Sequence, residues 1–265
     1  MSGAGPTIEA ARTEGRAALV GYLPAGYPTV EESIELLAAM VAAGVDVVEV
    51  GLPYSDPVMD GPTIQAAAEV ALARGTRITD VFRVVEASAA LAPTLVMTYW
   101  NPVERLGVSR FTRALAEAGG AGLITPDLIP EEADEWVAAA DETGLDKVFL
   151  VAPSSTTARL ERTSQACRGF IYATAVMGVT GAREATSAVA PELVARVHDV
   201  TSLPVGVGLG VSDGRQAAEV AAYAEAVIVG SAFVRAIADA DSHSAALTAV
   251  SRLSEDLSAG VRGQR

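Results

Sequence analysis

One acidic residue stands inside an apolar run that is typical of a buried strand. Glu49 lies between Val48 and Val50 in the run over residues 46–52. A carboxylate facing a protein core is costly unless it is paired or neutralised. Near the end of the strand and in apolar surroundings, the pKa of Glu49 should rise, which suits a general acid and base working near neutral pH. The alternative is a structural glutamate that pairs with an arginine in the interior.

The loop after this run carries two further acids. Asp56 and Asp60 alternate with prolines and a glycine over residues 53–62. The prolines should stiffen the loop, and an aspartate in such a turn serves as a cap or turn former as often as it serves in catalysis. Both roles therefore stay open for each of the two aspartates.

Glycines gather after the last three apolar runs of the chain. The clusters are Gly-Val-Thr-Gly at 178–181, Gly-Val-Gly-Leu-Gly at 206–210 and Gly-Ser at 230–231. Glycines let backbone N–H groups approach an anion closely, and a helix N-terminus favours negative charge, so the clusters predict a phosphate site. The alternative is that they only permit tight turns. Their spacing does not match the dinucleotide fingerprint.

The elements that must position these residues alternate regularly along the chain. Short β-branched runs followed by segments of helical period indicate a parallel sheet buried on both faces. The runs cover 18–23, 46–52, 94–99, 122–125, 147–152, 169–175, 203–208 and 226–230. The helical segments cover 29–43, 62–74, 79–90, 110–118, 131–142, 158–166, 191–198, 214–223 and 232–238. Eight such units predict an α/β fold, an eight-stranded parallel (β/α) TIM barrel, with a doubly wound open sheet as the alternative.

Helix boundaries and domain organisation follow from the same pattern. Residues 6–16 and 244–259 are predicted to form extra terminal helices. Thr29, Ser109 and Asp213 are candidate N-caps. Helices should end at the glycines 44, 75, 119 and 144. Because no linker or change in composition interrupts the chain, we expect one domain over residues 1–265. In a barrel of this kind the site is built from the loops after the strands.

Composition excludes several classes of partner. Of the 265 residues, 19 are Lys or Arg and 33 are Asp or Glu, for a net charge of −14, and half are apolar. An acidic protein of this kind is not expected to bind nucleic acid or an anionic membrane surface, because both carry negative charge. A single cysteine, Cys167, allows no internal disulfide. No secretory signal or long apolar span is visible, so we expect a cytoplasmic protein.

Scarce residue types narrow the chemistry. The only lysine, Lys147, opens the fifth run, at the end of the barrel opposite the expected site, which disfavours a Schiff base. The two histidines, His198 and His243, fall in outer or terminal helical segments, which disfavours a histidine-ligated metal site or a serine triad. Carboxylate acid and base chemistry on a phosphorylated substrate remains, with no metal site predicted.

The segment around Glu49 and Asp60 closely resembles the signature of the tryptophan synthase α subunit family. It reads Glu-Val-Gly-Leu-Pro-Tyr-Ser-Asp-Pro from Glu49 and Asp-Gly-Pro-Thr-Ile-Gln from Asp60. Further matches are Leu-Pro-Ala-Gly-Tyr-Pro at 23–28, Met-Thr-Tyr-Trp-Asn-Pro at 97–102, Pro-Asp-Leu at 126–128 and Gly-Val-Thr-Gly at 178–181. The resemblance runs nearly from end to end of the chain and is more specific than the barrel, which supports many chemistries.

This resemblance implies a lyase that splits indole-3-glycerol phosphate into indole and glyceraldehyde 3-phosphate, late in tryptophan biosynthesis. Glu49 would protonate indole C3 and manage the proton of the glyceryl hydroxyl, and Asp60 would accept a hydrogen bond from the indole N–H. Tyr172 would lie beside Glu49, with an ordinary core aromatic as the alternative. The positions implied to bind indole and phosphate are Tyr22, Thr180, Gly181, Gly208, Leu209, Gly210, Gly230 and Ser231.

A few positions depart from the family pattern. Tyr22 and Leu209 stand where some members carry Phe, and Ile129 interrupts a commoner Leu-Pro-Pro run. Residues 174–177 lack the polar side chains of some relatives. These differences affect the shape of the pocket and the neighbouring loops but leave Glu49 and Asp60 in place.

The resemblance also implies a partner, a β subunit that carries pyridoxal phosphate, in an α2β2 assembly. The chain itself would need no cofactor. Three alternatives remain open from the residues: a stand-alone indole-releasing lyase, a non-catalytic barrel that only activates its partner, and a different phosphosugar enzyme such as an isomerase or epimerase.

Overall fold

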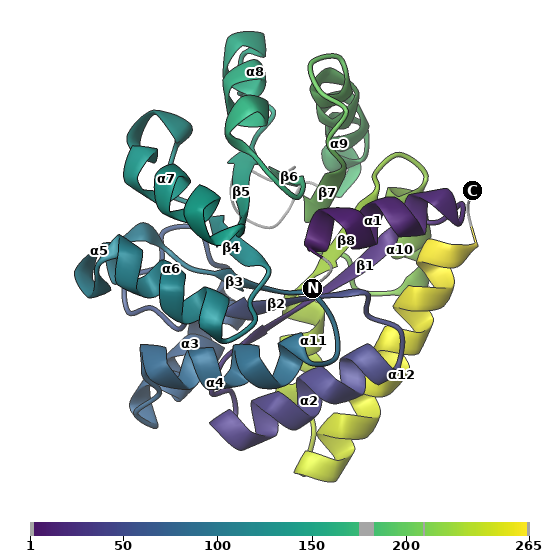
Figure 1. Cartoon of the computed structure of the whole chain (residues 1–265). Coiled ribbons are helices and arrows are strands. Elements are labelled where there is room, and N and C mark those ends of the chain that lie inside the picture. The colour runs from purple at the N-terminus through teal and green to yellow at the C-terminus, as the bar shows by residue number, and fades with distance from the viewer. Residues whose placement is uncertain (1–2, 175–182, 209, 264–265) are drawn as a thin grey trace.

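Eight parallel strands form a closed barrel in the computed structural model, which describes residues 3–174, 183–208 and 210–263. Each strand pairs with the next, and β1 closes the ring by pairing with β8 (Figure 1). The closed ring confirms the predicted barrel and excludes the open sheet. The strands are β1 (Ala18–Pro24), β2 (Val47–Gly51), β3 (Thr94–Met97), β4 (Gly122–Thr125), β5 (Asp146–Val151), β6 (Ile171–Thr174), β7 (Val205–Gly208) and β8 (Ala226–Val229).

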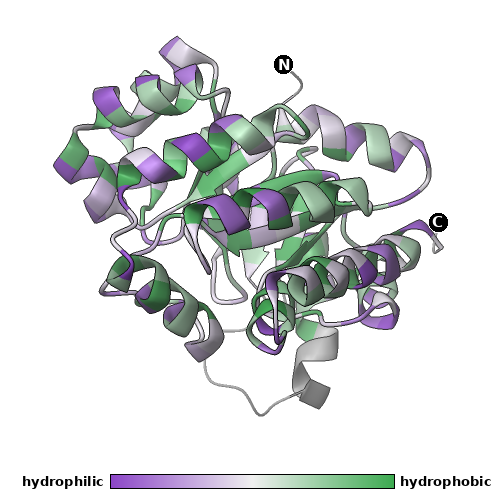
Figure 2. Ribbon diagram, turned by 90° about the horizontal axis from the view of Figure 1, so that it is seen from below, coloured by the Kyte–Doolittle hydropathy of each residue, from purple (hydrophilic) through white to green (hydrophobic). Residues whose placement is uncertain are grey.

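Helices surround the barrel and also close one of its ends (Figure 1). Apolar residues run along the central strands, whereas the helices carry polar residues on part of their surface (Figure 2). No helix in the described residues is long and apolar enough to cross a membrane. The helices are α1 (Ala4–Thr13), α2 (Val30–Ala42), α3 (Pro62–Ala73), α4 (Ile78–Ala89), α5 (Trp100–Leu106), α6 (Val108–Glu117), the 3₁₀ turn η1 (Pro130–Glu132), α7 (Asp134–Thr143), α8 (Thr157–Ala166), α9 (Arg183–His198), α10 (Gly214–Ala221), α11 (Ser231–Ala238) and α12 (His243–Arg262).

Most predicted helix boundaries are confirmed by their capping geometry. The Thr29 hydroxyl accepts a hydrogen bond from the Glu32 N–H at 3.2 Å, and the Asp213 carboxylate accepts one from the Gln216 N–H at 2.8 Å. The glycines 44, 75, 119 and 144 all have positive φ, between 74° and 111°. This is the conformation in which glycine ends a helix without steric cost.

Two predicted boundaries are wrong. Ser109 is not an N-cap, because α6 begins at Val108 and its cap is Gly107, with a φ of +94°. Helix α9 begins at Arg183 rather than at Pro191, which lies inside it. Pro191 was predicted to begin the helix because the missing N–H of a proline costs nothing in the first turn. Inside a helix it removes a backbone hydrogen bond, and α9 tolerates that loss.

Helix α5 is an element that the sequence pattern did not predict. Its first N–H, that of Trp100, donates to both carboxylate oxygens of Asp127, at 2.9 and 3.1 Å. Asp127 belongs to the loop after β4, so the carboxylate that stabilises this helix start comes from a different unit of the barrel. A local pattern cannot show a cap that is brought in by tertiary structure.

Alternate residues of each strand pack into two separate cores. Val48 and Val50 of β2 face outward and pack in the cluster beneath the helices. Val47 faces inward and packs in a smaller cluster inside the barrel, together with Tyr172 of β6 and Phe170, which precedes that strand. Because Glu49 lies between the two outward residues, its side chain faces the interior.

Helix α1 plugs the end of the barrel where the strands begin. Ala4, Ile8 and Ala11 are fully buried and belong to the interior cluster. The N-terminus of α1 is anchored by Asp146, whose carboxylate accepts a hydrogen bond from the Ala4 N–H at 3.0 Å. A Cβ at Gly5 would lie 2.6 Å from the carbonyl oxygen of Gly169, so this close approach requires glycine. The plug leaves the opposite end, after the strands, as the mouth of the barrel.

Candidate functional site

Glu49 is a buried acid in the wall of the barrel. It is 1% exposed, and in the sheet it lies opposite Tyr22 of β1 and Leu95 of β3. Its Oε2 atom has no hydrogen-bond partner among the described residues, and no described arginine pairs with it. A buried carboxylate without a cation is strongly disfavoured in its charged form. The structure therefore gives no support to a structural ion pair at this position.

Burial, and to a lesser extent the nearby charge of Asp60, raise the pKa of Glu49 to about 8. Each effect disfavours the carboxylate relative to the neutral acid. At neutral pH most Glu49 side chains therefore carry a proton. A carboxyl group in that state can give a proton and take one back without leaving the operating pH range.

Asp60 lies in the loop between β2 and α3, close enough to Glu49 for its charge to raise the pKa of Glu49. Burial raises its pKa, whereas a hydrogen bond with the Tyr99 hydroxyl lowers it. Asp56, in the same loop, is exposed and accepts a hydrogen bond from the adjacent Ser55 hydroxyl at 2.5 Å. Of the two candidate aspartates, Asp60 is therefore the one that faces Glu49.

Two tyrosines, the buried Tyr172 and the partly buried Tyr22, complete the wall around the acids. Burial raises the pKa of Tyr22 and of Tyr172 well above the usual range, and the charges of Glu49 and Asp60 add to both shifts. The structure thus brings together four sequence-predicted residues from β1, β2, β6 and the loop after β2. The tyrosines stay neutral and present aromatic surface and hydroxyl groups beside the acids.

Glycines on the strands make room for these rings. A Cβ at Gly51 would lie 2.2 Å from the Tyr22 hydroxyl oxygen, and one at Gly208 would lie 2.6 Å from that of Tyr172. A Cβ at Gly230 would lie 3.2 Å from Cδ1 of Tyr22. Gly208 and Gly230 therefore allow the two rings to pack closely against the strands. This is a role beyond the tight turns that were the alternative explanation for these glycines.

The predicted phosphate positions are described only in part. Gly210 follows β7 with a φ of +70° and has open space where a Cβ would lie. Gly230 precedes α11, which begins at Ser231 and has no side-chain cap. The first backbone N–H groups of α11 are therefore available to an anion. Thr180, Gly181 and Leu209 lie outside the described residues, as do residues 175–177 and the rest of the 178–181 cluster.

The single lysine and the two histidines pair with acids in other parts of the structure. Lys147, near the start of β5, pairs with Asp141 at 2.6 Å. His198, at the end of α9, pairs with Glu225 at 3.2 Å, and His243, at the start of α12, approaches Glu35 at 2.6 Å. Each of these groups joins neighbouring elements of the scaffold.

Tyr99, which follows β3, belongs to the site although its residue type and spacing did not predict a role for it. It is 5% exposed, and its hydroxyl oxygen accepts hydrogen bonds from the N–H groups of Met59 and Asp60, at 3.0 and 3.2 Å. The sequence feature that could have pointed to Tyr99 is its position just after an apolar run, in the segment at 97–102 that carries the family resemblance.

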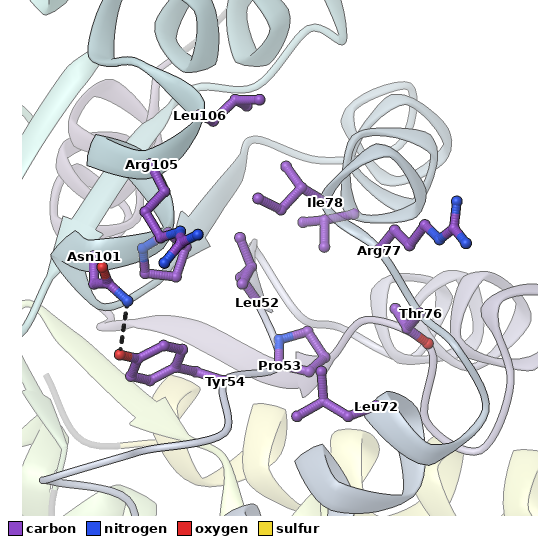
Figure 3. A pocket seen from close by; sticks show the side chains of 12 residues that line it. Leu52, Pro53, Tyr54, Leu72, Thr76, Arg77, Ile78, Asn101, Arg105 and Leu106 are labelled. Carbon is purple, nitrogen blue, oxygen red and sulfur yellow. Dashed lines mark hydrogen bonds between the residues drawn. The ribbon is translucent and has the colours of Figure 1, made fainter.

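A cavity of about 370 Å³ lies outside the barrel, beside the start of the same loop (Figure 3). Tyr54, the α3 to α4 junction and α5 form its walls, and Glu49 does not line it. Asp60 does not line it either, so this cavity is separate from the pair of buried acids.

Comparisons with known proteins agree on one family. The family model described as tryptophan synthase alpha chain matches residues 8–262. The tryptophan synthase alpha chain of Salinispora arenicola is 62% identical over 263 residues, covering 99% of this chain and 98% of the relative. That of Acidothermus cellulolyticus is 59% identical with the same coverage.

Solved structures give the same result. A chain of Mycobacterium tuberculosis tryptophan synthase is similar with a TM-score of 0.91 and 54% identity, covering 98% of each chain. The tryptophan synthase subunit alpha of Legionella pneumophila has a TM-score of 0.87 and 32% identity, again over 98% of each chain. The likeness therefore extends over the full barrel.

Proposed function

The chain belongs to the tryptophan synthase alpha chain family, and we propose that Glu49 and Asp60 carry out the reaction of that family in it. The reaction is the cleavage of indole-3-glycerol phosphate into indole and glyceraldehyde 3-phosphate in tryptophan biosynthesis, so the chain is a carbon–carbon lyase. The observation that carries the assignment of roles is the state of Glu49: buried, without a counter-ion in the described residues, and with a pKa of about 8.

In the first step the protonated carboxyl of Glu49 gives its proton to C3 of the indole ring. The ring nitrogen then carries positive charge, and the Asp60 carboxylate stabilises that charge by accepting a hydrogen bond from the N–H. A negative group fixed at this place stabilises the charge that develops during the reaction more than it stabilises the neutral ring of the bound substrate. The two acids are therefore needed in opposite protonation states.

In the second step the Glu49 carboxylate takes the proton of the hydroxyl on the carbon attached to the ring. That C–O bond becomes the aldehyde C=O, the bond from indole C3 to this carbon breaks, and its electron pair returns to the ring. Glu49 gives one proton and recovers one, so each cycle restores the starting acid.

The remaining predicted positions serve binding. We assign the indole pocket to Tyr22, Tyr172, Gly208 and Leu209, and we assign the phosphate to backbone N–H groups at Thr180, Gly181, Gly210, Gly230 and Ser231. The uncapped start of α11 and the open space at Gly210 support the phosphate assignment. We assign Tyr172 to contact with the reacting group, and the effect of the Glu49 and Asp60 charges on its pKa supports that assignment.

The chain forms a complex with a tryptophan synthase β subunit. We propose an α2β2 assembly in which pyridoxal phosphate is bound by the β subunit and the α chain uses no cofactor. We further propose that residues 1–265 act as one domain and that the complex works in the cytoplasm. The acids of this chain would then deliver indole to the chemistry of the partner.

The direct test is release of indole from indole-3-glycerol phosphate by the purified chain, with and without a purified β subunit. We expect indole and glyceraldehyde 3-phosphate in equal amounts, formed faster in the complex because active-site loops close when the partner is bound. Equal rates with and without the partner would favour a stand-alone lyase. Absence of indole in both reactions would favour a non-catalytic activator or an enzyme acting on another phosphosugar.

A further inference from the structure

Two loops of the barrel meet at one hydroxyl group. Residues 52–61 connect β2 to α3 without a helix or strand. Within this loop the consecutive N–H groups of Met59 and Asp60 both donate to the Tyr99 hydroxyl oxygen, which comes from the loop after β3. The hydrogen bonds fix the backbone of the residue that carries the second acid. The Gln65 side chain of α3 holds the same residue from its other end, by a hydrogen bond from Nε2 to the Asp60 carbonyl oxygen at 2.7 Å.

The Tyr99 ring is itself held from the other side. It packs against the Tyr54 ring with centroids 5.3 Å apart, and Asn101 donates a hydrogen bond from Nδ2 to the Tyr54 hydroxyl at 3.0 Å (Figure 3). Asn101 lies in the first turn of α5, the helix whose start is capped by Asp127. A continuous set of contacts therefore runs from the loop after β4 to the backbone of Asp60.

The hydrogen-bonding capacity of the Tyr99 hydroxyl is used up by the loop. A phenolic hydroxyl has one donor and two acceptor positions. The two N–H groups occupy the acceptor positions, and hydrogen bonding between Tyr99 and the Asp60 carboxylate uses the donor. No position is left for a substrate atom, so Tyr99 acts on the reaction through Asp60.

The charged and titratable groups around Asp60 differ in their effect. The charge of Asp60 raises the pKa values of Glu49 of β2, Tyr22 of β1 and Tyr172 of β6, and burial raises the pKa of Asp60 itself. Among the described residues, the Tyr99 hydroxyl is the group that lowers that pKa. The tyrosine therefore favours ionised Asp60 next to protonated Glu49, and pairs of acids with separated pKa values are the usual arrangement for distinct roles.

We propose that Tyr99 is the positioning residue that holds Asp60 in place, as an ionised acceptor, for the indole N–H. The inference rests on the function proposed above, because it concerns the group that Asp60 would bind. Tyr54 serves as the support of the Tyr99 ring.

The test is a double-mutant cycle in the complex with the β subunit. Tyr99→Phe keeps the ring and removes the hydroxyl, and it should lower kcat about 10- to 100-fold, the usual effect of losing a hydrogen bond to a charged group, with KM changed less than about threefold. The acidic limb of the kcat/KM profile should move to higher pH, because Asp60 loses the hydrogen-bond donor that lowers its pKa. In an Asp60→Asn background Tyr99→Phe should cost less than about threefold.

The matched control is Tyr223→Phe, at a half-buried tyrosine after α10 that contacts none of these groups. It should leave kcat and the pH profile unchanged. Equal loss from Tyr99→Phe with and without Asp60→Asn, or an unmoved acidic limb, would overturn the positioning role. Full activity of Asp60→Asn itself would instead overturn the proposed function, so the two failures are distinguishable.

A second variant covers the case in which Tyr99→Phe does not fold, as judged by its circular dichroism spectrum. Tyr54→Ala removes the ring beneath Tyr99 and leaves the hydroxyl in place. It should lower kcat about tenfold, move the acidic limb in the same direction, and become nearly neutral in the Asp60→Asn background. An additive loss would contradict the inference here as well.

Discussion

Replacing Glu49 with glutamine is expected to lower indole release from indole-3-glycerol phosphate by about 10³-fold or more. Glutamine has almost the same shape, but it cannot give a proton to C3 or take one from the hydroxyl, so both steps lose their acid or base. Because the site is buried and the charge of Glu49 is suppressed at neutral pH, the neutral amide fits the same surroundings. The rate of indole release is measured under saturating substrate.

Substrate binding by the Glu49→Gln variant should change little. An indole-bearing alkyl phosphate that lacks the reacting hydroxyl serves as the probe, and its Kd should stay within about threefold of that of the parent chain. Glu69→Gln, at an exposed glutamate on α3, is the matched control and should retain full turnover. If Glu49→Gln kept more than about a tenth of the parent turnover, the acid and base role would be refuted.

Replacing Asp60 with asparagine is expected to lower kcat by about 10²- to 10³-fold, the range found when a group that stabilises transition-state charge is removed. The variant should also alter the pH profile. Because the charge of Asp60 raises the pKa of Glu49, its removal lowers that pKa. The basic limb, on which Glu49 loses its proton, should therefore move to lower pH.

The control for this variant is Asp199→Asn, at an exposed aspartate beyond the end of α9, which should leave both rate and profile unchanged. An Asp60→Asn chain with lower kcat and an unmoved basic limb would mean that the two carboxyl groups do not sense one another. A chain with near-normal kcat would mean that the ring N–H needs no anionic acceptor.

Regular features of the barrel could be predicted because they depend on local pattern. The alternation of apolar runs and helical segments gave all eight strands, and the caps at Thr29 and Asp213 satisfy N–H groups only three residues away. Helix α5 was missed because Asp127, which caps it, lies 27 residues further along the chain. A signal of that kind exists only after the chain has folded.

Local pattern also could not show which of the two aspartates in the loop after β2 belongs to the site. Local sequence gave Asp56 and Asp60 equal standing, since both occur among turn-forming residues. Tyr99 distinguishes them, and it lies 39 residues from Asp60. Glu49 needed no such contact, because its place between outward-facing valines already put its side chain inside the barrel. Residues on strands are thus easier to assign from sequence than residues on loops.

The protonation state of Glu49 is the central claim, and a pH titration of its carboxyl group tests it most directly. The infrared difference spectrum between the parent chain and Glu49→Gln isolates the C=O stretching band of this one side chain. The band of the protonated acid should be present at neutral pH and disappear with a midpoint near 8. A carboxylate band at neutral pH, with a midpoint near the ordinary glutamate value of about 4.3, would contradict the account.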